Sequence, residues 1–349
     1  MLRMVLRDLQ WRRRRFVLAG LATALVFGMT LLLTGLTTAV ANEGTRTVGR
    51  FEADRWYVAN AGSGPFTSAP QVPQSLVDQL AATPGIEAVD PAIFLLDTVD
   101  DGDGLLDINI TALRPESSSW PEAFVGRSVP GAGEVVVDAN LGFEVGDVIA
   151  IDGADFTVAG EVRKVSRAFG IPTVFARLDD AQRIALGGLP LVSAVAVRGQ
   201  PDAPVTNATE LDDAAMVADL ARPLARGTDS ITFILVLLMI TAAGIVGLIV
   251  YLSTLERTAD LAVLRATGSS KRFVALTLAI QGLLLSLTAG VAAAGIAQLL
   301  TPLFPLALEI EAGSYVQLLA IALGVGVLAS LAGVWRAVRT DPAIAFGGP

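Results

Sequence analysis

The chain has 349 residues, of which 53% are hydrophobic and only 17% are charged, whereas soluble domains carry about 25% charged residues. This composition excludes an ordinary soluble globular protein. The absence of Cys and His excludes disulfide bonds, thiolate catalysis and the commonest metal ligand. The formal net charge of −9 gives no guide to partners, because basic and acidic residues occupy different parts of the chain.

The N-terminal segment, residues 1–15, has the pattern of a cytoplasmic amphipathic helix. Its apolar residues fall on one helical face and its arginines on the other, which is typical of a helix lying on a membrane surface. A basic segment that serves only to set the membrane topology explains the same residues equally well.

Four apolar runs predict four membrane-spanning helices. We assign the spans to residues 16–40, 230–254, 275–300 and 315–336. Each run is long enough to cross a hydrocarbon core of about 30 Å, and only a helix satisfies its own backbone hydrogen bonds in lipid. The first run resembles a cleaved secretory signal at its "AVAN" end, but it is much longer than the roughly 7–15 apolar residues of a signal core. We therefore expect it to remain as an anchor.

The distribution of charge predicts how the spans are oriented. Residues 1–15, the 255–274 loop and the 337–349 tail with the adjoining Arg336 together carry twelve basic and four acidic residues. Region 41–229 carries 13 basic and 28 acidic residues. Because basic residues next to spans stay on the cytoplasmic side, we expect both termini in the cytoplasm, and region 41–229 and the 301–314 loop outside the cell membrane.

The pattern of region 41–229 predicts a mixed α/β domain. The segment "SLVDQLAATPGIEAVDP" predicts a helix that ends at Pro84–Gly85 and a following strand. The segment "GEVVVDANLGFEVGDVIAIDGADFTVAGEV" predicts short strands separated by Gly and Asp turns, and "LDDAAMVADLARPLAR" predicts a helix that leads back to the membrane. The expected fold is an α-helical membrane protein with four transmembrane helices (1+3) and an extracytoplasmic α/β domain inserted after the first.

One acidic segment of this domain, "DDGDGLLD" at Asp100–Asp107, has carboxylates at alternating positions, as a calcium-binding loop does. It lacks the D-x-D-x-D-G register and the distal Glu of such a loop. We expect a solvated turn between two strands, and no metal site.

The motifs of common enzymes are missing from the sequence. It contains no G-x-x-x-x-G-K-[ST] phosphate loop, no G-x-S-x-G and no H-E-x-x-H. The predicted spans contain neither Lys nor Asp, so they also lack the buried charges that mark an ion-driven pump. We expect no enzymatic activity, and we expect any energy for transport to come from a partner.

The predicted 255–274 loop, "LERTADLAVLRATGSSKRFV", is patterned as a helix although it connects two spans. Leu255, Ala259, Ala262 and Ala266 share one stripe, and acidic residues occupy the first turns, where they favour the helix dipole. Gly268 stands where a helix typically ends. The small residues allow another protein to approach closely; an amphipathic linker lying on lipid is the alternative.

The loop closely resembles the coupling helix of ABC-transporter permeases of the FtsX/MacB type (type VII, mechanotransmission), written E-R-x-x-E-I-A-x-L-x-A-x-G. Asp260 stands where the family usually has Glu. Three further features agree: the ending "WRAVRTDPAIAF", the strand segment "NLGFEVGDVIAIDGADFTVAGEV" and the one-plus-three order of spans.

This resemblance implies a mechanism and a set of partners. Such permeases are homodimers in membrane lipid that pair with two copies of a separate ABC ATPase, which binds ATP and Mg²⁺, whereas the permease needs no cofactor of its own. No nucleic-acid partner is expected. The coupling residues that the resemblance implies are Glu256, Arg257, Asp260, Leu261, Leu264, Arg265 and Gly268.

The compact size is similar to that of HrtB-type haem-efflux permeases, which implies export of a hydrophobic or amphipathic substrate, with haem as the candidate. Without His or Cys, the ligands left for haem iron are Met, Tyr and carboxylates. The candidates are Met29, Glu309, Glu311 and Tyr315. A lipid, peptide or antibiotic is an alternative cargo. An FtsX-like switch that activates a cell-wall hydrolase without transport is the alternative function.

Overall fold

The computed structural model describes residues 13–60, 64–68, 71–100, 104–167, 170–256, 263, 270–301 and 310–338. The predicted N-terminal helix therefore lies largely outside the described residues. The chain forms two compact units, one comprising Met1–Thr38 with Gly227–Pro349 and the other Ala39–Arg226. We refer to them as the membrane unit and the exterior domain.

The described part of the membrane unit contains four long apolar helices. They are α2 (Arg13–Gly49), α6 (Ala225–Glu256), α8 (Lys271–Leu300) and α9 (Ala312–Val338). Segments long and apolar enough to cross a membrane are Phe16–Gly49, Asp229–Glu256, Arg272–Leu300 and Ala312–Leu331. The expected fold class is confirmed. The first helix continues past residue 40, where the predicted span ends, through a polar stretch as far as Gly49.

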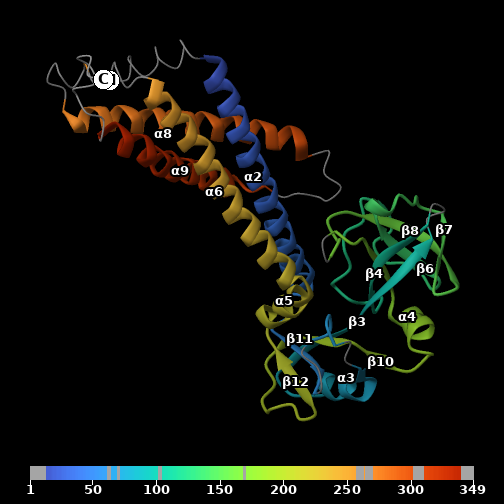
Figure 1. The fold of residues 1–349 in the computed structure, drawn as a ribbon. Helices are drawn as coiled ribbons and strands as arrows, with labels where there is room; N and C mark the ends of the chain where they lie inside the picture. Colours follow the sequence, from blue (N-terminus) through green and yellow to red (C-terminus); the bar gives the residue numbers. More distant parts are fainter. Residues whose placement is uncertain are drawn as a thin grey trace. The chain divides into compact units, whose positions relative to one another are not determined.

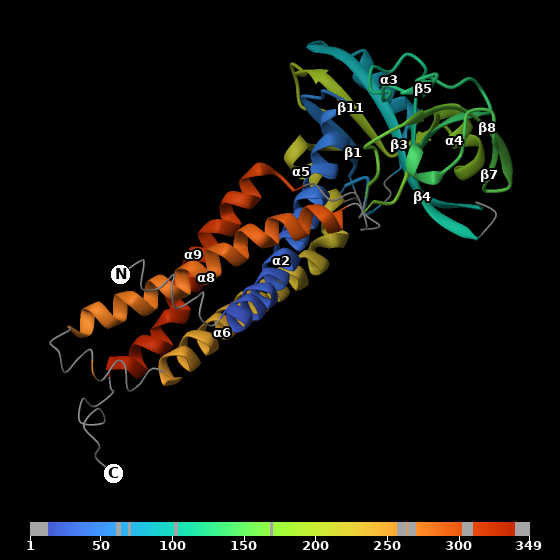
Figure 2. The same ribbon diagram turned by 90° about the horizontal axis from the view of Figure 1, so that it is seen from above.

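Small residues allow α8 and α9 to pack closely, and the two helices lie side by side in both views (Figures 1 and 2). A Cβ at Gly326 of α9 would collide with Ser286 Oγ and lie 2.9 Å from Leu283 Cα of α8. A Cβ at Gly282 would lie 3.0 Å from the carbonyl oxygen of Gly326. Close backbone approach at small residues is the main source of helix association in lipid, where burial of apolar surface gives little.

The exterior domain is built on a mixed sheet whose described strands follow the order β12-β1-β11-β3-β4-β9-β6-β8-β5, with β7 pairing with β3 and β8. These strands are β1 (Arg55–Ala59), β3 (Ile86–Asp100), β4 (Leu105–Leu113), β5 (Val125–Gly126), β6 (Glu134–Asp138), β7 (Val148–Ile151), β8 (Ala154–Val162), β9 (Thr173–Arg177), β11 (Ala194–Gly199) and β12 (Ala208–Leu211). A separate pair is formed by β2 (Val72–Pro73) and β10 (Leu191–Val192).

Alternation along the strands gives the sheet two apolar faces. Val135 and Val137 of β6 join one buried cluster, whereas Val136 between them joins another. Successive strand residues point to opposite faces, so a run of valines supplies both. The first cluster includes residues of helices α3 (Gln74–Ala81) and α4 (Leu178–Ala185). The second includes Val48 at the end of α2 and Met216 of helix α5 (Asp213–Ala221).

Several predicted elements of this domain are present. Helix α3 precedes Pro84–Gly85, and β3 starts at Ile86. Gly85 has a φ of +90°, and a Cβ there would collide with the carbonyl oxygen of Gln200. Strands β3 and β4 form an antiparallel hairpin in which Asp100 pairs with Leu105. Residues 101–103 lie outside the described residues, so the preference for a solvated turn stays a prediction.

Candidate functional site

The described residues at the two ends of the predicted coupling loop mark where α6 ends and α8 begins. Glu256 is the last residue of α6 and is exposed. At the other end, Ser270 caps α8, because its hydroxyl oxygen accepts a hydrogen bond of 3.2 Å from the backbone N–H of Phe273. Between them, helical Val263 is exposed. The remaining predicted coupling residues, Arg257, Asp260, Leu261, Leu264, Arg265 and Gly268, lie outside the described residues.

A buried polar contact joins α6 and α8 near this loop. The side-chain amide of Gln281 donates a hydrogen bond of 3.2 Å to Ser253 Oγ, and both residues are buried. An unsatisfied buried amide costs about 1–3 kcal/mol, so this bond favours one alignment of the two helices. Gln281 stands out in the sequence as a polar residue within a span, but its partner Ser253 carries no comparable signal.

The candidate haem ligands have different environments. Met29 on α2 is 43% exposed, whereas the neighbouring Gly28 faces Ile296 and the backbone of Ala293 on α8. Tyr315, in the first turn of α9, packs partly buried against the apolar cluster of the membrane unit, and Glu311 immediately before that helix is exposed. Glu309 lies outside the described residues. In the single chain, the side chain of Met29 is therefore exposed at the surface of the membrane unit.

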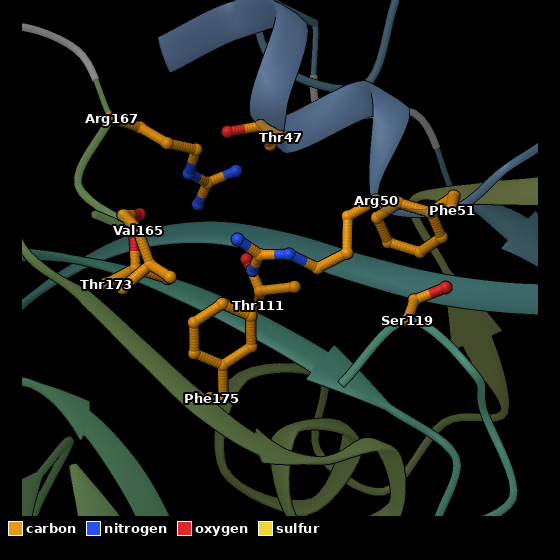
Figure 3. Close-up of a pocket in the computed structure, with 9 residues that line it drawn as sticks. All are labelled: Thr47, Arg50, Phe51, Thr111, Ser119, Val165, Arg167, Thr173 and Phe175. Carbon is orange, nitrogen blue, oxygen red and sulfur yellow. The ribbon is translucent and has the colours of Figure 1, made fainter. Parts of the chain in front are cut away.

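The sequence does not indicate a small cavity of the exterior domain that two arginines line. The cavity has a volume of about 10 Å³ and lies between the end of α2 and one face of the sheet. Figure 3 shows the side chains of Arg50 and Arg167 entering it from opposite sides, with their guanidinium groups directed toward the same space. The remaining lining residues are Thr47, Phe51, Thr111, Ser119, Val165, Thr173 and Phe175.

The two arginines are unusual because both are largely withdrawn from water. Arg167 is 3% exposed, and its Nε is buried with no hydrogen-bond partner among the described residues. Burial and the neighbouring charge of Arg50 lower the pKa of Arg167 to about 9, against the opposing effect of Glu43. Burial lowers the pKa of Arg50 to about 10. Both values lie well above neutral pH, so both groups stay charged.

Aromatic rings provide part of the surroundings of these charges. The guanidinium carbon of Arg50 lies 5.3 Å from the centre of the Phe175 ring. That of Arg167 lies 5.6 Å from the Phe66 ring and 5.5 Å from the Phe94 ring. Such contacts favour a cation, although by only about 0.5–2 kcal/mol each. The sequence offers no sign of this cluster, because its two arginines are far apart along the chain and only the fold brings them together.

Two family models match the chain, and together they cover most of it. The MacB-like periplasmic core domain matches residues 19–215, and the FtsX-like permease C-terminal model matches residues 232–342. The chain is 37% identical over the full length of both proteins to the uncharacterized ABC transporter permease Rv2563 of Mycobacterium tuberculosis strain H37Rv. It is 35% identical, again over both full lengths, to the uncharacterized ABC transporter permease Rv0072 of the same strain.

Two solved structures show lower similarity to the exterior part of the chain. The periplasmic region of MacB from Actinobacillus actinomycetemcomitans aligns with a TM-score of 0.37 and 13% identity, covering 46% of this chain and 89% of that one. The extracellular domain of the transporter YknZ from Gram-positive bacteria aligns with a TM-score of 0.33 and 12% identity, covering 43% and 84% of the two chains.

Proposed function

Because this chain belongs to the family of FtsX/MacB-type ABC transporter permeases, we propose that it is the membrane subunit of an efflux system driven by a separate ATPase. Permeases of this family are multi-pass transport subunits with an extracytoplasmic segment, and an ABC permease works with an ATPase. We propose in addition that two copies of the chain pair with two ATPase subunits in the lipid bilayer, with all termini in the cytoplasm.

The observation that carries this proposal is the helical character of both connections to the exterior domain. Helix α2 is unbroken over 37 residues, which corresponds to about 55 Å at 1.5 Å per residue. A hydrocarbon core is only about 30 Å thick, so the helix extends beyond it. On the return path, α5, a short 3-10 turn at Arg222–Leu224 and α6 follow one another without an intervening loop.

Inside the exterior domain these two connections are packed together. A Cβ at Gly44 of α2 would lie 3.2 Å from Val217 Cγ1 and 3.3 Å from Leu220 Cδ2, both on α5, so the missing side chain permits a close approach. The end of α2 also supplies Val48 to the buried cluster that includes Met216 of α5. A movement of either helix therefore acts on the same face of the sheet, which supports a mechanical mode of action.

The ATPase-docking surface in this proposal is the loop between α6 and α8, with Glu256 as its first charged residue. Replacement Glu256→Arg reverses that charge at an exposed position. We expect the ATPase turnover that the full-length permease stimulates in lipid nanodiscs to fall to the level of the ATPase alone, because the loop no longer docks. Glu87→Arg, at an exposed position of β3, is the matched control and should retain stimulation. Full stimulation in Glu256→Arg would contradict the docking assignment.

For the cargo we propose haem, as the flat amphipathic ligand that the candidate residues fit. Methionine sulfur and tyrosine phenolate are axial ligands of haem iron, a carboxylate offers an anionic oxygen donor, and Met29 is exposed at the surface of the membrane unit. A second copy of the chain facing Met29 would enclose the ligand between two such surfaces, with Glu309, Glu311 or Tyr315 as the further donor.

Haem binding can be measured by absorbance of the purified full-length chain. Added haem should shift the Soret band, and Met29→Ala and Glu311→Ala should reduce that shift, whereas Met239→Ala in α6 should leave it unchanged. No shift, or the same shift in every variant, would exclude haem and leave a lipid, peptide or antibiotic as cargo. Capture of a cell-wall hydrolase by the exterior domain, without any effect of cargo on ATPase turnover, would favour the FtsX-like switch over efflux.

A further inference from the structure

We propose that the cavity between Arg50 and Arg167 binds a single-atom monovalent anion, such as chloride, and that this anion joins the end of α2 to the sheet of the exterior domain. The proposed site is independent of the cargo and of the ATPase. It consists only of residues within the exterior domain.

The charge of the cavity favours a compensating anion. Two guanidinium groups point into one small space, and the charged groups that act on Arg167 among the described residues are Arg50 and Glu43. The single carboxylate of Glu43 offsets one of the two positive charges, which leaves one positive charge in a partly buried place. Burying an unbalanced charge is unfavourable, and a monovalent anion offsets that cost.

The hydrogen-bonding groups in the cavity also suit an anion. A guanidinium is a donor only, and the Nε of Arg167 is buried without an acceptor among the described residues. Figure 3 shows the hydroxyl group of Thr47 directed toward the Arg167 guanidinium, so α2 also supplies an uncharged polar group to the cavity wall. The hydroxyl group of Thr173 donates a hydrogen bond of 2.6 Å to the carbonyl oxygen of Val165. Because this hydroxyl is uncharged, it does not balance the positive charge of the arginines.

The small size of the cavity favours a single-atom anion over a larger one. A volume of about 10 Å³ is at the lower limit for one water molecule, which needs about 10–15 Å³ by the same measure. A carboxylate, sulfate or phosphate group has several heavy atoms and would have to displace the buried walls formed by Val165 and Phe175. A chloride ion is larger than water, so its binding requires a small outward movement of the two flexible arginine side chains, but it needs less room than a polyatomic anion and carries the single charge required.

Occupation of the cavity has a structural consequence. Thr47 and Arg50 belong to the end of α2 and the turn that follows it, whereas Thr111 lies on β4 and Thr173 on β9. An anion held between the two arginines therefore bridges the helix and the sheet at the place where α2 enters the exterior domain. Without the anion, repulsion between the guanidinium groups opposes the same packing.

The test is thermal unfolding of the full-length chain in lipid nanodiscs, followed by tryptophan fluorescence, because Trp56 is fully buried and its ring lies 4.9 Å from that of Phe51. At constant ionic strength, chloride or bromide in place of gluconate should raise the unfolding midpoint by about 2–6 °C. Arg167→Met should abolish this shift. Arg163→Met, at an exposed arginine over the Phe124 ring, is the matched control and should retain it.

Equal midpoints in chloride and gluconate, or an undiminished chloride shift in Arg167→Met, would overturn the proposal. A sulfate effect equal to that of chloride would overturn the assignment to a single-atom anion. If Arg167→Met does not fold, ³⁵Cl NMR on the unmodified chain decides: the chloride line should broaden on addition of the protein, and excess bromide should reverse the broadening. An unbroadened line, or one that bromide leaves unchanged, would contradict the site.

Discussion

At the scale of single residues, buried charges hold the irregular parts of the exterior domain in place. Asp219 of α5 is fully buried, and its carboxylate accepts hydrogen bonds from the backbone N–H of Phe66 at 2.9 Å and from the hydroxyl of Thr67. The ring of Phe66 in turn lies 4.7 Å from that of Phe94. One carboxylate thus fixes the segment that forms part of the aromatic surroundings of Arg167.

Replacement Asp219→Ala should therefore destabilise the protein strongly. It leaves the N–H of Phe66 without its acceptor and removes the partner of Arg222, whose guanidinium lies 3.6 Å from Asp219 Oδ1. We expect a loss of about 2–4 kcal/mol in the free energy of unfolding. Chemical denaturation of the full-length chain measures it, with Asp155→Ala, at an exposed position of β8, as the control. Equal stability of the two variants would mean that Asp219 does not anchor this segment.

At the scale of elements, the sequence predicts those structures that depend on local patterns. Hydropathy indicates the four long helices, and alternation along "ADFTVAGEV" indicates the strand β8. Asp212 before α5 is a typical cap, and its side chain accepts from the N–H of Ala215 at 2.7 Å. The continuation of α2 from residue 40 to Gly49 was not predicted, because its polar composition indicates only where lipid ends and not where the helix ends.

Contacts between distant segments could not be predicted in this way. Arg167 follows β8 within an irregular segment, and nothing near it in sequence indicates burial beside Arg50. The approach of Gly44 to α5 likewise depends on packing of the whole domain. The coupling loop, by contrast, is assigned from its sequence pattern alone. Most of its residues lie outside those that the structure describes.

At the scale of the whole molecule, our proposal is that the permease acts by movement, and it rests on the continuous helices α2 and α5–α6 that lead into and out of one tightly packed domain. The relatives that match over the full length are ABC transporter permeases, which supports an energy source in a partner ATPase. The loop after α6 receives that energy in our proposal, and α2 and α6 carry it to the sheet. Docking of the loop and transmission through the helices involve different residues, so a substitution can disrupt one step without the other.

The most direct test of this account is a distance measurement on the exterior domain during the ATPase cycle. The chain has no Cys, so Glu87→Cys at an exposed position gives one spin label per copy. In the assembled complex, the distance between labels on two copies should differ between the nucleotide-free and the vanadate-trapped states, and Glu256→Arg should abolish the difference. An unchanged distance while the complex hydrolyses ATP normally would contradict mechanical transmission to the exterior domain.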